Sequence, residues 1–164
     1  MERGVEQAMD SMQERLTALL TELSETAAPS GYEQPVAAKV AAELRPYCDE
    51  VRVDALGNII AKRSGTRPVS GPRPRFMIAA HMDEIGLIVT KIEDTGFLRF
   101  APIGGIDPRT IVAQEVTVLS DPPLPGFIGV KPPHLLSDDE REKAIPIDEM
   151  FIDVGMDAEA VRRR

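Results

Sequence analysis

The sequence predicts an α/β domain followed by a small β-rich domain, with a boundary near residue 84. Before that point, two amphipathic helical stretches lead into a hairpin and then into a continuous apolar run at residues 76–80. Beyond it, short strands alternate with Gly/Pro turns, and helical patterns are rare. The chain has 164 residues, 43% of them hydrophobic and 28% charged, which is typical of a soluble globular protein of one or two domains.

Two helices are predicted at the start of the chain. Apolar side chains that recur every three or four residues form a single stripe, at Val5, Met9, Met12, Leu16, Leu19, Leu20 and Leu23. Residues 26–31 end this helix. Ser30, with Glu33 three residues later and Pro35 in the first turn, then predicts the start of a second helix, which Pro46 ends.

A hairpin and a buried strand follow. Residues 51–54 alternate apolar and polar side chains, and residues 58–61 return after a turn, which predicts two paired strands. Residues 76–80 are apolar without alternation. Because both faces of such a strand must be covered, we expect it in the middle of a sheet between helix layers.

The remainder of the chain favours a small β-barrel or sandwich, since many short strands with Gly/Pro turns are typical of those folds. The strands are expected at residues 85–89, 97–100, 111–119, 126–130 and 150–154. Asp157 can cap a final helix of about two turns, too short to be stable alone. With too few elements before residue 84 to cover both faces of a sheet, we expect an N-terminal piece of a longer protein.

Composition excludes several classes of partner. There are 19 Lys and Arg against 27 Asp and Glu, a net charge of −8, so nucleic-acid binding is disfavoured. No segment approaches the ~18 apolar residues of a membrane span, so no membrane partner is expected. The single cysteine, Cys48, rules out an internal disulfide and suits a reducing cytoplasm. We therefore expect a cytoplasmic protein.

The candidate chemistry lies where the predicted buried strand ends. The chain has two histidines, and one of them, His81, follows that strand with Asp83 two residues on. In an extended chain these two side chains point to the same face. An imidazole can bind a metal, and a neighbouring carboxylate can orient it. Spacing alone leaves open a second interpretation, a hydrogen-bonded histidine beside a solvated acidic pair.

Five stretches in order resemble the M42 family of metallo-aminopeptidases. They are Ala28–Glu33, Asp54–Asn58, Ala80–Gly86, Gly126–Leu135 and Phe151–Gly155. The resemblance implies that residues 1–83 are the N-terminal part of a zinc-peptidase-like α/β catalytic domain. It implies that residues 84–164 are an inserted, β-barrel-like dimerisation domain, cut short at its C-terminal end.

The resemblance also implies a chemistry. The family removes N-terminal residues from peptides with two divalent metals, zinc or cobalt, and many members assemble from dimers into dodecamers; some relatives are called endoglucanases. On the matching motif His81 would be a metal ligand, and Asp83 would be the catalytic-site carboxylate that orients it. His134 lies in the stretch that resembles the inserted domain and is expected to be structural or interfacial.

The chain departs from the family pattern after these residues. The family's bridging Asp, its Glu-Glu pair, a further acid and a last His follow the inserted domain, and none of them has a counterpart here. We therefore expect this polypeptide to be part of an aminopeptidase and to be inactive by itself. The alternative is a non-catalytic module that acts through dimerisation.

Overall fold

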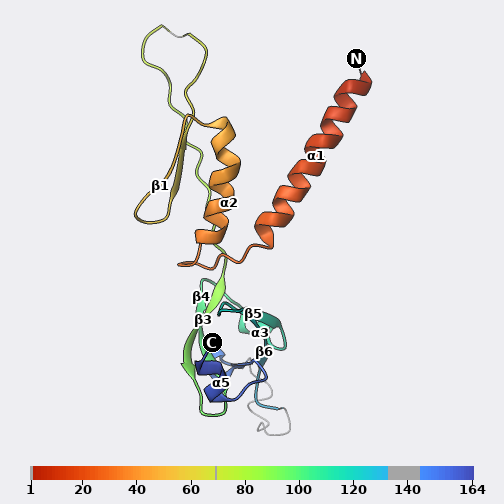
Figure 1. Cartoon of the computed structure of the whole chain (residues 1–164), viewed down its shortest axis with the longest axis vertical. Coiled ribbons are helices and arrows are strands. Elements are labelled where there is room, and N and C mark those ends of the chain that lie inside the picture. The colour runs from red at the N-terminus through yellow and green to blue at the C-terminus, as the bar shows by residue number, and fades with distance from the viewer. Residues whose placement is uncertain (1, 69, 133–144) are drawn as a thin grey trace. The chain divides into compact units, whose positions relative to one another are not determined.

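The structure, a computed structural model, describes residues 2–68, 70–132 and 145–164. The chain forms two compact units, Met1–Glu84 and Ile85–Arg164, whose elements are labelled in Figure 1. Helices and strands both occur in each unit, which confirms the α/β class. No helix in these described ranges is long and apolar enough to cross a membrane.

The first unit contains the predicted helices and the predicted hairpin. Its elements are α1 (Glu2–Ser24), α2 (Gln34–Leu44), the 3-10 helix η1 (Arg45–Tyr47), β1 (Glu50–Val53) and β2 (Ile59–Lys62). The two strands pair antiparallel. In the turn between them, the Asp54 carboxylate accepts hydrogen bonds from the backbone N–H groups of Leu56 and Asn58. A short acidic side chain is favoured at such a position because it replaces a backbone acceptor in the turn.

The predicted start of α2 is wrong in one respect. Pro35 lies in the first turn as expected, but the residue before the helix is Glu33, and no side chain caps the first N–H groups. The Glu33 carboxylate instead accepts a 2.6 Å hydrogen bond from the backbone N–H of Gly31. Ser30, expected to cap this helix, uses its hydroxyl in another contact.

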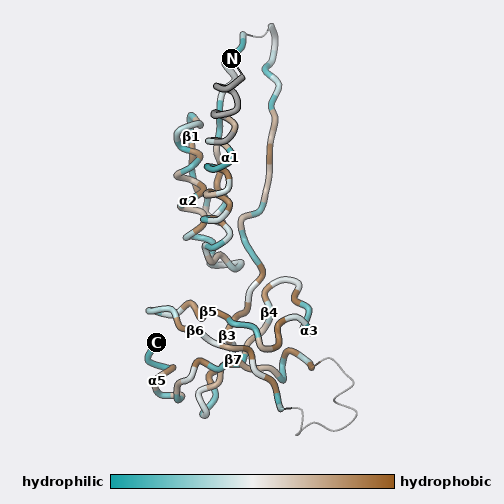
Figure 2. Tube along the Cα trace, turned by 90° about the vertical axis from the view of Figure 1, so that its right-hand side faces the viewer, coloured by the Kyte–Doolittle hydropathy of each residue, from teal (hydrophilic) through white to brown (hydrophobic). Residues whose placement is uncertain are grey.

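The buried strand predicted at residues 76–80 is also wrong. This stretch is extended but pairs with no strand in the part of the chain that the structure describes. The side chains of Phe76, Met77 and Ile78 are 92%, 91% and 97% exposed. Figure 2 shows the apolar colour along the extended segment that leads into the second unit. An apolar run becomes a buried strand only when neighbours supply ladder partners and cover, and the described residues supply neither.

This exposed run should make the polypeptide self-associate. Contiguous apolar surface of this kind favours contact between copies. We expect size-exclusion chromatography with light scattering to give a molar mass that rises above 17.9 kDa with concentration. Ile78→Glu should lower that mass, whereas Leu56→Glu, at an equally exposed turn, should not. A monomer at all concentrations would contradict this expectation.

The second unit is built on one curled antiparallel sheet. Its elements are β3 (Gly86–Ile92), β4 (Leu98–Ile103), α3 (Pro108–Ile111), β5 (Glu115–Val118), β6 (Leu124–Gly129), η3 (Ile147–Glu149), β7 (Phe151–Asp153) and α5 (Ala158–Arg162). The strand order is β3-β4-β7-β6-β5. The strand expected from residue 111 begins later, because Asp107 accepts a hydrogen bond from the Arg109 N–H and caps the short helix α3.

The core of this unit lies on β4, β7 and β6, where β7 pairs with each of the other two strands. Its fully enclosed member is Met150, at 0% exposure. The other buried members of the cluster are Leu98, Phe100, Ile128, Ile152 and Val161. Val161 belongs to α5, so this helix of barely more than one turn is stabilised by burying one face. Asp157 caps it as predicted, accepting a 2.8 Å hydrogen bond from the Ala160 N–H.

The turn between β3 and β4 approaches the segment before α5 very closely. Gly96 has φ +94°, and a Cβ atom built on it would lie 2.1 Å from the Met156 carbonyl oxygen. Gly96 also donates its N–H to the Glu93 carbonyl oxygen at 3.0 Å, closing the turn. Only glycine fits both the positive φ and the contact, so this residue determines how α5 meets the sheet.

Candidate functional site

His81 and Asp83 lie at the end of the first unit, on the extended stretch that follows the exposed apolar run. His81 is therefore on a loop and does not follow a sheet strand, contrary to the prediction. Its side chain is 86% exposed. The expected meeting of the two side chains does occur, with His81 Nδ1 3.2 Å from Asp83 Oδ1.

The contacts of His81 determine which ring nitrogen carries the proton. Nδ1 also lies 3.0 Å from the backbone carbonyl oxygen of Asp83. A carbonyl oxygen only accepts hydrogen bonds, so Nδ1 must be the protonated nitrogen of the neutral ring. The lone pair then resides on Nε2. The imidazole is thus held by one nitrogen and offers the other to a ligand.

The Asp83 carboxylate has both of its oxygens engaged. Oδ2 accepts a 2.6 Å hydrogen bond from the Ser30 hydroxyl, while Oδ1 faces His81. The hydrogen bond from Ser30, with smaller contributions from the Asp83 backbone and then from His81, holds the pKa of Asp83 below its usual range. The carboxylate is therefore charged at neutral pH. A charged carboxylate can accept a hydrogen bond from the imidazole N–H and hold the ring in one orientation.

The loop that carries Ser30 is fastened to the loop that carries Asp83. The Glu84 N–H donates to the Ala28 carbonyl oxygen, and the Ala28 N–H donates to Glu84 Oε1, both at 2.9 Å. Pro29 and Glu84 form an isolated parallel bridge at the same place. Ala28 is only 2% exposed. These reciprocal bonds hold together two segments that are far apart in the sequence.

Sequence reasoning did not find the roles of Ser30 and Glu84. The pattern of Ser30 and Glu33 matched a helix start, and that local interpretation accounted for the hydroxyl. The sequence indicates Glu84 only as the second member of the acidic pair that follows His81. No local pattern indicates either role, because each partner lies more than 50 residues away in the sequence.

The residues present fit one protein ligand of a divalent metal. His81 supplies one available nitrogen, and Asp83 orients the ring. Within the described ranges, no group of three or more His, Cys, Asp or Glu side chains could hold a metal. His134, the other histidine, lies outside the described residues. These side chains can bind or orient, and a full metal centre would need further ligands.

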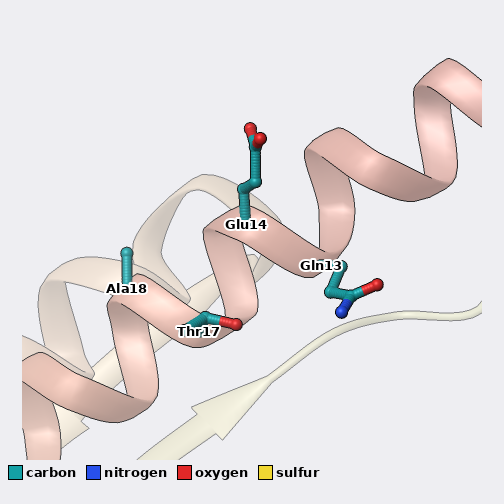
Figure 3. Close-up of a pocket in the computed structure, with 4 residues that line it drawn as sticks. All are labelled: Gln13, Glu14, Thr17 and Ala18. Carbon is teal, nitrogen blue, oxygen red and sulfur yellow. The ribbon is translucent and has the colours of Figure 1, made fainter.

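A hollow of about 580 Å³ lies along α1, and neither His81 nor Asp83 lines it. It is lined by Gln13, Glu14, Thr17 and Ala18 (Figure 3). Glu14 is the one titratable side chain among the four, so the hollow holds no pair of groups that could share acid and base roles. We assign no chemistry to it.

Comparison with known proteins decides the family. Residues 57–163, more than half of the chain, match the M42 glutamyl aminopeptidases. The chain belongs to the M42 family. Its relatives include the lysyl aminopeptidase of Pyrococcus furiosus, 38% identical over 140 residues, which cover 84% of this chain and 39% of that protein. This M42 chain therefore spans about 40% of the length of the curated relatives that it matches.

Solved structures agree. The TET aminopeptidase of Thaumarchaeota archaeon SCGC AB-539-E09 is 36% identical with a TM-score of 0.83, over 92% of this chain and 41% of its own. The TET1 peptidase of Pyrococcus horikoshii is 34% identical with a TM-score of 0.74, over 90% of this chain and 43% of its own. That peptidase can assemble into a tetrahedron or a large octahedral shell. A Thermotoga maritima structure named an endoglucanase is 31% identical with a TM-score of 0.69, over 87% and 40%.

Proposed function

We propose that this M42 chain is the N-terminal portion of a metal-dependent aminopeptidase that hydrolyses N-terminal residues from peptides. The observation that carries the proposal is the His81 ring, fixed through Nδ1 with Nε2 left available. On this proposal, residues 1–83 belong to the α/β catalytic domain and residues 84–164 to an inserted β-rich dimerisation domain.

Each residue has a defined task in this proposal. His81 would bind a divalent metal, zinc or cobalt, through Nε2, and Asp83 would hold the Nδ1 proton and keep the ring in place. A divalent metal held there would polarise the substrate carbonyl and activate a water molecule. The remaining ligands and the general base are expected from residues beyond those described here.

Dimers, and dodecamers built from them, are proposed as the assembly. The name of the Pyrococcus horikoshii relative supports assembly, as does the exposed apolar surface of this chain. The single free cysteine supports a cytoplasmic location.

An endoglucanase function has weaker support. Glycoside hydrolysis needs two carboxyl groups across one bond, with the pKa of the acid raised. Here the pKa of Asp83 is lowered. Glu84 Oε1 is engaged by the Ala28 N–H, which is a structural use of that carboxylate.

The test of the proposal is zinc binding at His81. The two histidines of the chain give two sets of imidazole signals in ¹⁵N-histidine spectra, which a His134→Ala variant assigns. Titration with Zn²⁺ should shift His81 Nε2 in a saturable manner, and His81→Ala should remove that response. A module that acts only by dimerisation would self-associate with no change at His81 on adding Zn²⁺, and that outcome would refute Zn²⁺ binding by His81 in this polypeptide.

A further inference from the structure

Ser30 makes the side-chain contact between the α1–α2 loop and Asp83. Its hydroxyl donates to Asp83 Oδ2 at 2.6 Å, across 53 residues of sequence. Its own backbone is held in place, because residues on either side of it are bonded. Ala28 exchanges two hydrogen bonds with Glu84, and the Tyr32 N–H donates to the Pro29 carbonyl oxygen at 2.8 Å. The hydroxyl is therefore presented from a fixed position.

The effect of this bond on His81 follows from the geometry of a carboxylate. The two oxygens of Asp83 are equivalent until one of them is engaged. With Oδ2 held by Ser30, Oδ1 is the oxygen that faces His81 Nδ1, at 3.2 Å. His81 is so exposed that packing cannot hold its ring. Orientation of the ring thus depends on Asp83, and orientation of Asp83 depends on Ser30.

We propose that Ser30 is a positioning residue, which fixes the tautomer and orientation of His81 through Asp83. Loss of the hydroxyl frees the carboxylate to rotate toward water. The Nδ1 proton then keeps only the Asp83 carbonyl oxygen as an acceptor, so the Nδ1–H tautomer is favoured less and the Nε2–H tautomer gains population. The expected gain in metal affinity at Nε2 rests on the proposed function. The expected effect on the tautomer does not.

The test measures the tautomer directly. At pH 8, the ¹⁵N shifts of the ring report which nitrogen carries the proton. We expect the Nδ1–H form at His81 in the unaltered chain and a marked gain of the Nε2–H form in Ser30→Ala. Ser30→Thr keeps the hydroxyl and should restore the original shifts. Ser24→Ala is the matched control, because that hydroxyl donates to the Leu20 carbonyl oxygen of its own helix.

A second readout is Zn²⁺ affinity at His81 in the same variants. Loss of the group that orients a metal-binding histidine typically lowers metal affinity 10–100-fold. Ser30 contacts Asp83 and not the histidine itself, so loss of its hydroxyl should lower the affinity about tenfold. Ser30→Ala should therefore weaken binding about tenfold, with Ser30→Thr and Ser24→Ala unchanged. Backbone amide spectra confirm that each variant keeps the fold.

The outcomes separate the two proposals. Unchanged His81 ring shifts in a folded Ser30→Ala variant would overturn the positioning role, whatever the metal does. A changed tautomer with no Zn²⁺ response in any variant would support the positioning role and overturn Zn²⁺ binding by His81 in this polypeptide. Shifts that change equally in Ser24→Ala would attribute the effect to the helix and would also overturn the role of Ser30.

Discussion

The 164-residue polypeptide is expected to hydrolyse no aminoacyl p-nitroanilide above background, even with added Zn²⁺ or Co²⁺. A catalytic zinc site uses about three protein ligands and a water molecule. Within the described residues, His81 is the one proposed ligand and no group of three His, Cys, Asp or Glu side chains that could hold a metal is present. A general base contributes roughly 10²–10⁴-fold, and positioning of the substrate contributes several kcal/mol more. Neither contribution can be assigned to a described residue.

The measurement needs a positive and a negative control. The lysyl aminopeptidase of Pyrococcus furiosus, assayed on the same panel, shows that the assay detects an intact relative. The variant His81→Ala shows whether any turnover comes from a contaminant. Turnover that disappears in this variant would contradict the expectation. It would mean that residues outside the described ranges, such as His134, complete a working site.

The substitution Gly96→Ala is expected to destabilise the second unit by more than about 2 kcal/mol. Placing an L-residue in the left-handed region costs roughly 1–2 kcal/mol. In addition, the new Cβ would lie 2.1 Å from the Met156 carbonyl oxygen, which belongs to the backbone and cannot rotate away. The hairpin and the segment before α5 must move apart, and the burial of Val161 is lost with them.

Gly155→Ala provides the control within the same unit. Gly155 also has positive φ, at +68°, but nothing lies within 4 Å of its Cβ position. It should cost only the conformational strain, about 1–2 kcal/mol. Both tyrosines of the chain lie in the first unit, so urea unfolding is best followed by the methyl signals of Met150 and Ile152. Equal losses for the two variants would show that the contact with Met156 is not what matters.

The elements that could be predicted from the sequence are those whose cause is local. The apolar stripe of α1, the turn at Asp54 and the cap at Asp157 each need only a few neighbouring residues. The start of β5 was misplaced because the Asp107-Pro108 pair is a helix-start pattern inside an otherwise β-like stretch. Residues 76–80 were misjudged because burial depends on partners that the run itself does not contain.

The residues of the candidate site also differ in how far their contacts could be predicted from local sequence. His81 and Asp83 could be paired from their two-residue spacing, and the structure does bring them together. The protonated nitrogen could not be deduced, because it depends on the Asp83 carbonyl oxygen. Ser30 was missed because a hydroxyl that satisfies a local pattern can be used by a distant carboxylate instead. The contacts of Ser30 and Glu84, which join distant parts of the chain, are thus the ones that local patterns could not predict.

The reciprocal bonds between Ala28 and Glu84 have a consequence for the order of folding. They close a loop of 56 residues, whereas α2 and the hairpin of β1 and β2 need only near neighbours. The entropy of closure grows with loop length, and contacts between distant residues form slowly. During synthesis, residue 84 also leaves the ribosome long after residue 28. We therefore expect these bonds, and with them the contact between Ser30 and Asp83, to form after α2 and the hairpin.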